Sequence, residues 1–242
     1  MNIKILTGNQ IKLLLIILMF IDHAVYIIGS DSKDVYYFAA LISRVVAPGM
    51  IYFLVEGYHY TRNLKSYIWR MLIFAIISQF AYSYAFSYSF FPSFDELTKQ
   101  TVNVIWGLFC GLLSMAVLCP KEREIRPWLK AIAFIVLCLM ALPADFMMVA
   151  VVATPLMYRY YDNYFVKISI LSILSFTINF VCYYSSGMIF IKSLLLGLSS
   201  MMVIVIFYLY SGERGRMKFM KWFFYCFYPA HLLLLGIIAN NM

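Results

Sequence analysis

The feature that most constrains this chain is a series of long, nearly uninterrupted runs of apolar residues. Of its 242 residues, 64% are hydrophobic and only 12% are charged, whereas soluble domains are usually about half apolar and about a quarter charged. A water-soluble fold has too little polar surface to cover such an excess. The runs are continuous rather than alternating, which favours membrane helices over a membrane barrel. The sequence therefore predicts an all-α, polytopic membrane helix bundle, formed as a single domain over residues 1–242.

A helix needs about 20 apolar residues to cross a bilayer. By this measure nine segments are expected to span the membrane: 11–28, 36–55, 67–90, 103–119, 128–143, 146–160, 165–183, 188–210 and 222–240. The fifth and sixth segments are short and separated by "ALPADF", so broken or re-entrant helices are the alternative there. The first segment is too long for a signal peptide and is expected to remain as the first membrane helix.

Basic residues set the expected orientation, because cytoplasmic loops are enriched in Lys and Arg. With a cytoplasmic N-terminus, the inner loops hold Lys4, Lys12, Arg62, Lys65, Arg70, Lys121, Arg123, Arg126, Lys130, Arg159, Lys167, Arg214, Arg216, Lys218 and Lys221. The outer loops hold only Lys33 and Lys99. Nine spans then place the C-terminus outside the cytoplasm. The net charge of +8 is thus a topology signal and does not indicate a nucleic-acid partner.

Ionisable residues at membrane depth are costly and usually face the interior of the bundle. Asp22 and His23 stand side by side near the middle of "LLLIILMFIDHAVYIIG". Lys12 precedes His23 by eleven residues, which is close to three helical turns, so both lie on one helix face roughly 16 Å apart. The simpler interpretation is a polar packing cluster, with Lys12 reaching out to the interface.

The stretch "SRVVAPGMIYFLVEGYHYTRN" at 43–63 carries a second polar group. Arg44 lies in the outer half of the second span, where Pro48 can kink the helix, and it needs an anion such as Asp22 or a substrate group. Glu56 lies near the inner end. The basic residues that follow, Arg62 and Arg70, either serve topology alone or hold phosphates.

The stretch "MKFMKWFFYCFYPAHLL" at 217–233 carries a third group. Lys221, Tyr225 and Tyr228 share one helix face, and Pro229 frees the backbone carbonyl of Tyr225. An aromatic belt at the interface explains part of this pattern, but not His231 deeper in the span. Elsewhere, Gln79 is placed to bridge helices and Asn103 to cap one.

These residues supply two histidines at membrane depth, a neighbouring acid, a buried Arg and a basic inner mouth. Neutral His is the usual general base near neutral pH, and a carboxylate such as Asp22 could orient it. Phosphates pair well with Arg and Lys. The five cysteines have no metal-ligand or CxxC spacing, so neither a metal site nor a disulfide framework is expected.

Four segments in this order resemble the TraX family: "LTGNQIKLLLIILMFIDH", "SRVVAPGMIYFLVEGYHYTRN", "YIWRMLIFAIISQ" and "KWFFYCFYPAHLLLL". The family's namesake acetylates the N-terminus of the F-type conjugative pilin, and the family is akin to larger transmembrane acyltransferases. Those carry an Arg in the first helix that is separated by ten residues from a catalytic His. Here Lys12 and His23 keep that spacing, while Ser78–Gln79 departs from the Ser-Glu that is common in relatives.

The resemblance implies an acetyltransferase of the bacterial inner membrane that takes acetyl-CoA from the cytosol. Its implied catalytic residues are His23, Asp22 and His231. Its implied acetyl-CoA-binding residues are Lys12, Arg44, Glu56, Arg62, Asn63, Arg70, Lys221, Tyr225 and Tyr228. The acceptor would be a pilin or other peptide N-terminus, with an envelope glycan or lipid-linked sugar as the alternative, and no metal is expected.

Two other classes of protein compete with this interpretation. A proton-coupled transporter also buries His, Asp and Arg, but such folds often repeat internally, and no half-to-half repeat is visible in the sequence. A hydrolase is disfavoured because the chain has neither a GxSxG nor an HExxH motif. A non-enzymatic assembly factor would leave the ionisable residues unexplained.

Overall fold

A computed structural model describes residues 4–29, 32–91, 102–121, 124–144, 146, 148–216 and 219–242, apart from the side chain of Lys221. The charged residues Lys99, Arg123, Asp145 and Lys218 lie outside the described residues. Within these ranges the regular elements are helices, and there are also two isolated β-bridges. The all-α prediction is therefore confirmed.

Six described helical segments are long and apolar enough to cross a membrane, which makes the chain a multi-pass membrane protein. They are Gly8–Ile28, Lys33–Tyr60, Leu64–Ser87, Tyr164–Ser185, Phe190–Tyr208 and Trp222–Asn240. The helices that compose them are α1 (Gly8–Ile28), α2 (Lys33–Ser43), α3 (Val46–Tyr60), α4 (Leu64–Ser87), α9 (Tyr164–Ser185), α10 (Phe190–Ser200), α11 (Val203–Tyr208) and α12 (Met220–Asn240).

Three further segments predicted to span the membrane form shorter apolar helices: α6 (Val104–Leu118), α7 (Pro127–Ala141) and α8 (Val149–Arg159). They have 15, 15 and 11 residues. At a rise of about 1.5 Å per residue each is shorter than the roughly 30 Å hydrocarbon core. The predicted helices are therefore present, but these three are not of full crossing length.

The second span is interrupted at Arg44 and Val45, where α2 ends and α3 begins. Pro48 accounts for the position of the break, because it has no N–H to donate to the carbonyl of Arg44 in a continuous helix. In the first turn of α3 that missing donor costs nothing. The interruption leaves Arg44 at the junction of two helices.

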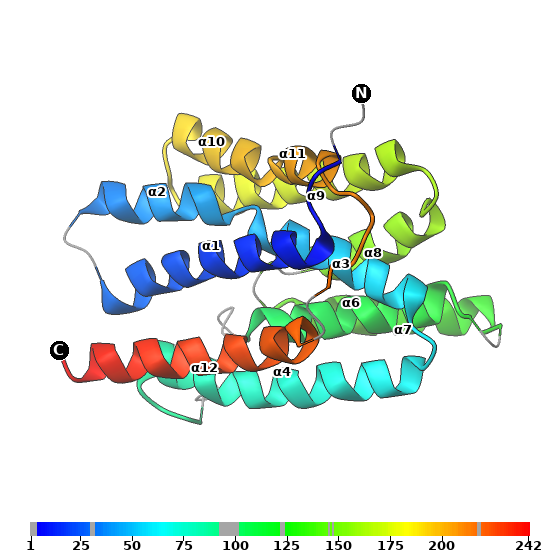
Figure 1. Cartoon of the computed structure of the whole chain (residues 1–242), viewed down its shortest axis with the longest axis horizontal. Coiled ribbons are helices and arrows are strands. Elements are labelled where there is room, and N and C mark those ends of the chain that lie inside the picture. The colour runs from blue at the N-terminus through cyan, green and yellow to red at the C-terminus, as the bar shows by residue number, and fades with distance from the viewer. Residues whose placement is uncertain are drawn as a thin grey trace. The chain divides into compact units, whose positions relative to one another are not determined.

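The described residues fall into two compact units. Unit 1 comprises residues 1–50, 84–88 and 172–242, and unit 2 comprises residues 51–83 and 89–171. In unit 1, α1 packs between α2 and α12, and α10 packs on the other side of α2 (Figure 1). Gly49 permits the close approach of α3 to α1, since a Cβ there would lie 2.5 Å from Leu15 Cδ1.

Unit 2 is organised around α6, which packs against α7 and α8. Ser114 and Thr154 tie α6 to α8 by donating to the carbonyls of Val151 and Gly111, both at 2.8 Å. Asn103 caps α6 as predicted, accepting from the N–H of Trp106. Its amide nitrogen donates to Gln79 Oε1 at 2.8 Å, so Gln79 does bridge α4 to the start of α6.

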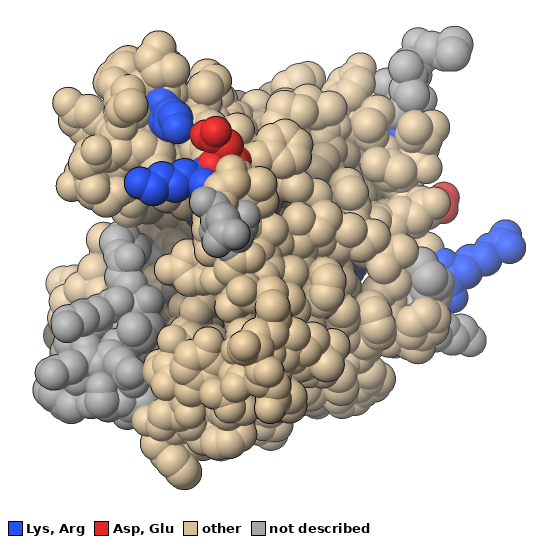
Figure 2. All heavy atoms as spheres, turned by 90° about the vertical axis from the view of Figure 1, so that its left-hand side faces the viewer, with Lys and Arg blue, Asp and Glu red and all other residues tan. Residues whose placement is uncertain are grey.

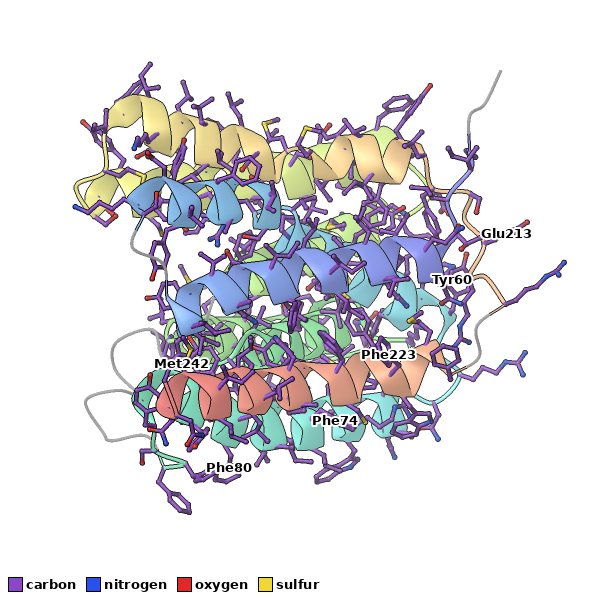
Figure 3. All side chains as sticks on the ribbon, turned by 60° about the vertical axis from the view of Figure 1, so that its left-hand side comes forward. Tyr60, Phe74, Phe80, Glu213, Phe223 and Met242 are labelled. Atoms are coloured by element: carbon purple, nitrogen blue, oxygen red, sulfur yellow. The ribbon has the colours of Figure 1, made fainter. Side chains whose placement is uncertain are left out.

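Large apolar side chains cover much of the outer surface. Figure 3 shows them standing out along α4 and α12, among them Phe80 and Phe223, which are 40% and 37% exposed. Seen from the end where α2 begins, few charged groups interrupt the described surface (Figure 2). This pattern suits lipid, which replaces the solvent along the helices.

Candidate functional site

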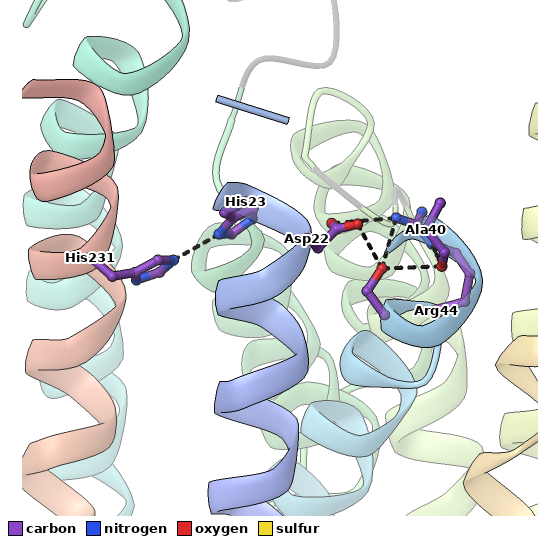
Figure 4. Close-up of polar contacts among 6 residues, drawn as sticks. Asp22, His23, Ala40, Arg44 and His231 are labelled. Carbon is purple, nitrogen blue, oxygen red and sulfur yellow. Dashed lines mark hydrogen bonds and ion pairs between the residues drawn. The ribbon is translucent and has the colours of Figure 1, made fainter. Parts of the chain in front are cut away.

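The centre of the candidate site is a pair of histidines in unit 1, His23 on α1 and His231 on α12. His23 Nδ1 lies 2.7 Å from His231 Nε2 (Figure 4). The ring planes differ by only 10° and the centroids are 5.0 Å apart. Because the two nitrogens are only 2.7 Å apart, the ring centroids can be 5.0 Å apart only if both nitrogens lie on the line between the ring centres. The rings are therefore edge to edge in one plane, joined by a hydrogen bond.

The surrounding hydrogen bonds fix which nitrogens carry protons. His231 Nδ1 lies 2.8 Å from the carbonyl oxygen of Phe227, and since a carbonyl can only accept, His231 Nδ1 carries the proton. Neutral His231 then has its lone pair on Nε2, so His23 donates to it from Nδ1–H. Neutral His23 consequently keeps its own lone pair on Nε2. No described residue makes a hydrogen bond to that nitrogen.

Aromatic rings line the histidine pair. The ring of Tyr228 is centred 6.2 Å from that of His23 on one side, and the ring of Phe86, at the end of α4, is 6.4 Å away on another. Tyr228 and His231 are only 4% and 3% exposed. The walls restrict water around the imidazoles, which strengthens the polar contacts made there.

Asp22 faces away from His23, although the two are neighbours in sequence. Successive residues of a helix point about 100° apart, and Figure 4 shows Asp22 directed toward Arg44 while His23 is directed toward His231. Ser43 Oγ donates to Asp22 Oδ1 at 2.8 Å, and Arg44 Nη2 lies 3.6 Å from Asp22 Oδ2. The partner of the His23 imidazole is thus a second imidazole, in place of the expected acid.

Arg44 is held at the break between α2 and α3. Its Nε donates to the carbonyl of Ala40 at 3.2 Å, and its guanidinium lies 5.6 Å from the centroid of the Tyr183 ring. The side chains of Arg44 and Asp22 remain 25% and 26% exposed. Because this ion pair is partly exposed, an anionic group of a substrate could compete with Asp22 for the Arg44 guanidinium.

The remaining predicted residues of unit 1 lie along the same two helices. Lys12 is half-buried on α1, eleven residues before His23. On α12, Tyr225 is half-buried one turn before the buried Tyr228, and the side chain of Lys221 lies outside the description. Unit 1 thus gathers His23, His231 and Tyr228 into one cluster, with Asp22 and Arg44 on the other side of α1.

The other predicted residues belong to unit 2. Glu56, near the end of α3, accepts from the hydroxyl of Tyr161 at 2.9 Å and lies 3.6 Å from Lys167 Nζ. Lys167 is only 5% exposed, and neither it nor Tyr161 was a predicted site residue. The signal that could have revealed Lys167 is its position four residues inside an apolar helix, where a cation needs a carboxylate.

Arg62 and Asn63 are exposed in the loop between α3 and α4. Asn63 Oδ1 accepts from the N–H of Ser66 at 2.9 Å, which caps the start of α4. Arg70 Nη1 donates to Ser66 Oγ one turn earlier at 2.8 Å. These contacts fix the loop and leave the Arg62 guanidinium exposed. Among the described residues no group of three His, Cys, Asp or Glu side chains could hold a metal ion.

The family of the chain is shown by its match to a family model described as TraX protein, which covers residues 7–239. The chain belongs to the TraX family. It is also 28% identical over 232 residues to a protein of Dichelobacter nodosus named "Probable fimbrial assembly protein FimC, serogroup H1", with 93% of each chain covered. No solved structure matches the chain.

Proposed function

We propose that this TraX-family protein is a membrane acetyltransferase. It moves an acetyl group from cytosolic acetyl-CoA to an acceptor amine or hydroxyl, with His23 as the reacting base or acetyl carrier. The observation that carries the proposal is the hydrogen bonding of the histidine pair, because the tautomer deduced from it leaves the lone pair of His23 Nε2 available while Nδ1 is engaged by His231. A neutral imidazole held in this way is what general-base and nucleophilic catalysis require.

Two routes use the same nitrogen. In the first, Nε2 of His23 removes a proton from the acceptor while the acceptor attacks the thioester carbonyl. In the second, Nε2 itself attacks that carbonyl and an acetyl-imidazole forms, which the acceptor then cleaves. In both, the carbon–sulfur bond breaks and the CoA thiolate leaves and takes up a proton. His231 accepts the hydrogen bond from Nδ1–H throughout and so stabilises charge that develops on His23.

The proposed acceptor is the N-terminal amine of a pilin or another surface peptide. The fimbrial assembly named in its Dichelobacter nodosus relative favours this class, and an O-acetylated envelope glycan is the alternative. We further propose nine membrane crossings in the bacterial inner membrane, with a cytoplasmic N-terminus. In that orientation the basic loops that follow α3 and α8 face the compartment that supplies acetyl-CoA.

The test uses purified protein in nanodiscs and acetyl-CoA labelled on the acetyl group. Wild-type protein should bind the donor saturably and release CoA slowly without an acceptor, whereas His23→Ala should bind it but release none. Equal expression and equal thermal unfolding of the two proteins are the control for folding. Full turnover by His23→Ala would remove His23 from the mechanism, and an absence of saturable binding by folded wild-type protein would favour a transporter.

A further inference from the structure

A second feature, in unit 2, is an exposed imidazole held firmly in one orientation. His59 lies one residue before the end of α3, and its ring stacks on that of Tyr161 with centroids 3.8 Å apart and planes only 5° apart. His59 is nevertheless exposed to the surroundings. The stacked contact holds the exposed imidazole in one orientation.

Tyr161 is held in place from behind. The Lys167 ammonium lies 4.1 Å from the centroid of the Tyr161 ring, and it must occupy the face opposite the stacked imidazole, because both cannot fit on one face. Glu56 accepts from the Tyr161 hydroxyl and pairs with Lys167. Burial, with the nearby Glu56 carboxylate adding to it, raises the pKa of Tyr161, so the hydroxyl remains a donor. The stacked pair thus rests on a buried ion pair.

The backbone of His59 is fixed as well. Lys121, just after α6, donates from Nζ to the carbonyls of Tyr58 and His59, the latter at 2.9 Å. Tyr58 in turn donates to the carbonyl of Cys119 at 2.8 Å. The end of α3, where Figure 3 labels Tyr60, is therefore tied to the end of α6. Both the ring and the main chain of His59 are preorganised before any ligand arrives.

The described residues of unit 2 carry more positive than negative charge. The described cations of unit 2 are Arg62, Lys65, Arg70, Lys121, Arg126, Lys130, Arg159 and Lys167, and the described acids are Glu56, Glu124 and Asp162. Glu56 pairs with Lys167 and Glu124 with Lys130, which leaves Asp162 as the remaining carboxylate. Arg62, three residues after His59 in the sequence, is exposed. Arg159 is also exposed, and its neighbour in sequence, Tyr158, has its ring centred 6.1 Å from that of His59.

An aromatic belt at the membrane interface is the simplest competing explanation, since Tyr and Trp collect there. It accounts for the exposed Tyr60 and Tyr160. It does not account for an imidazole stacked on a ring that a buried Lys–Glu pair supports. A flat, preorganised ring, with exposed arginines three residues after it and two residues before its stacking partner, is instead suited to a nucleotide, whose base stacks on a ring and whose phosphates pair with guanidinium groups.

We infer that His59 is the stacking platform for the adenine ring of acetyl-CoA, with Arg62 and Arg159 facing its phosphates. This inference rests on the proposed function, because it assigns a place to the nucleotide end of the proposed donor. Recognition there would be separate from the chemistry at His23. Removal of the His59 ring should therefore lower kcat/KM for donors that carry the nucleotide and leave kcat/KM for other donors unchanged.

The experiment compares acetyl-CoA with S-acetylpantetheine, which has the same thioester but no nucleotide. The readout is kcat/KM for thiol release by the protein in nanodiscs. His59→Ala should lower kcat/KM for acetyl-CoA about tenfold, the usual worth of one stacked base, and leave S-acetylpantetheine unchanged. His59→Phe, which restores a flat ring, should recover most of the loss. Trp69→Ala, which removes another exposed aromatic of unit 2, should change neither donor.

An equal fall with both donors, or no fall with acetyl-CoA, would overturn the inference. Binding of desulfo-CoA, which has no reactive thioester, is measured by calorimetry. This measurement distinguishes failure of the inference about His59 from failure of the proposed function. Binding that depends on His59 in a protein without turnover would uphold the platform and contradict the acetyltransferase. No binding of desulfo-CoA by folded wild-type protein would overturn both.

Discussion

Replacing His231 with leucine removes the acceptor for the Nδ1–H of His23. In the native pair this bond is 2.7 Å long and lies among aromatic rings that leave His231 only 3% exposed. A buried donor left without a partner costs about 1–3 kcal/mol. The neutral imidazole of His23 avoids that cost by moving its proton to Nε2, the nitrogen proposed to react. The population of the reactive tautomer should therefore fall about 5- to 150-fold.

The assay is the release of CoA from acetyl-CoA at saturating donor. We expect kcat to fall by that factor in His231→Leu, with KM little changed, because the donor is not held by His231. His231→Gln is the matched control, since its amide oxygen can accept from His23 Nδ1 close to the place of the lost Nε2 and should restore most of the rate. Equal rates for His231→Leu and wild type, or equal losses for the leucine and glutamine variants, would refute this account of the pair.

Two further predictions concern stability in detergent. Asp22→Asn leaves Arg44 without its carboxylate. Because the pair is about a quarter exposed, we expect the free energy of unfolding to fall by about 1–2 kcal/mol and Tm to fall by roughly 2–8 °C. The Asp22→Asn/Arg44→Gln double variant should recover this stability. If Asp22 serves only this pair, the double variant releases CoA as fast as Arg44→Gln alone, and a slower release by the double variant would give Asp22 a further role in the reaction. Gly49→Ala places a methyl group against Leu15 and should cost about 1–3 kcal/mol, relieved by adding Leu15→Ala. Thermal unfolding that leaves Gly49→Ala equal to wild type would contradict the close approach of α3 to α1.

Much of the fold could be predicted from the sequence, because the physical chemistry of lipid leaves few choices. Apolar runs long enough to cross the bilayer must become helices, and the helices lie where the runs are. The lengths of α6, α7 and α8 were less predictable. Hydropathy shows that a segment is apolar, but it does not show where polar caps and turns set the two ends of the helix. Asn103, which caps the start of α6, is an example.

The candidate site was predictable in its members and much less so in its pairings. Helical periodicity places His23 deep in α1, but it does not identify a partner 208 residues away on α12. The expected support of His23 by Asp22 fails for a local reason, since neighbouring residues of a helix point in different directions. Lys167 was interpreted as a loop charge because it stands near a helix end, whereas the fold closes Glu56 and two tyrosine rings around it.

The separation of the two histidines has a consequence for the life of the protein in the cell. During synthesis α1 enters the membrane early, while His231, the hydrogen-bond partner of His23, is still to be translated on α12. The nascent chain therefore carries His23 without this partner through most of its insertion, and the tautomer proposed to react is favoured only when α12 packs against α1. Under the proposed function, half-made chains and chains whose α12 fails to insert would consume acetyl-CoA more slowly than the complete protein, without any inhibitor.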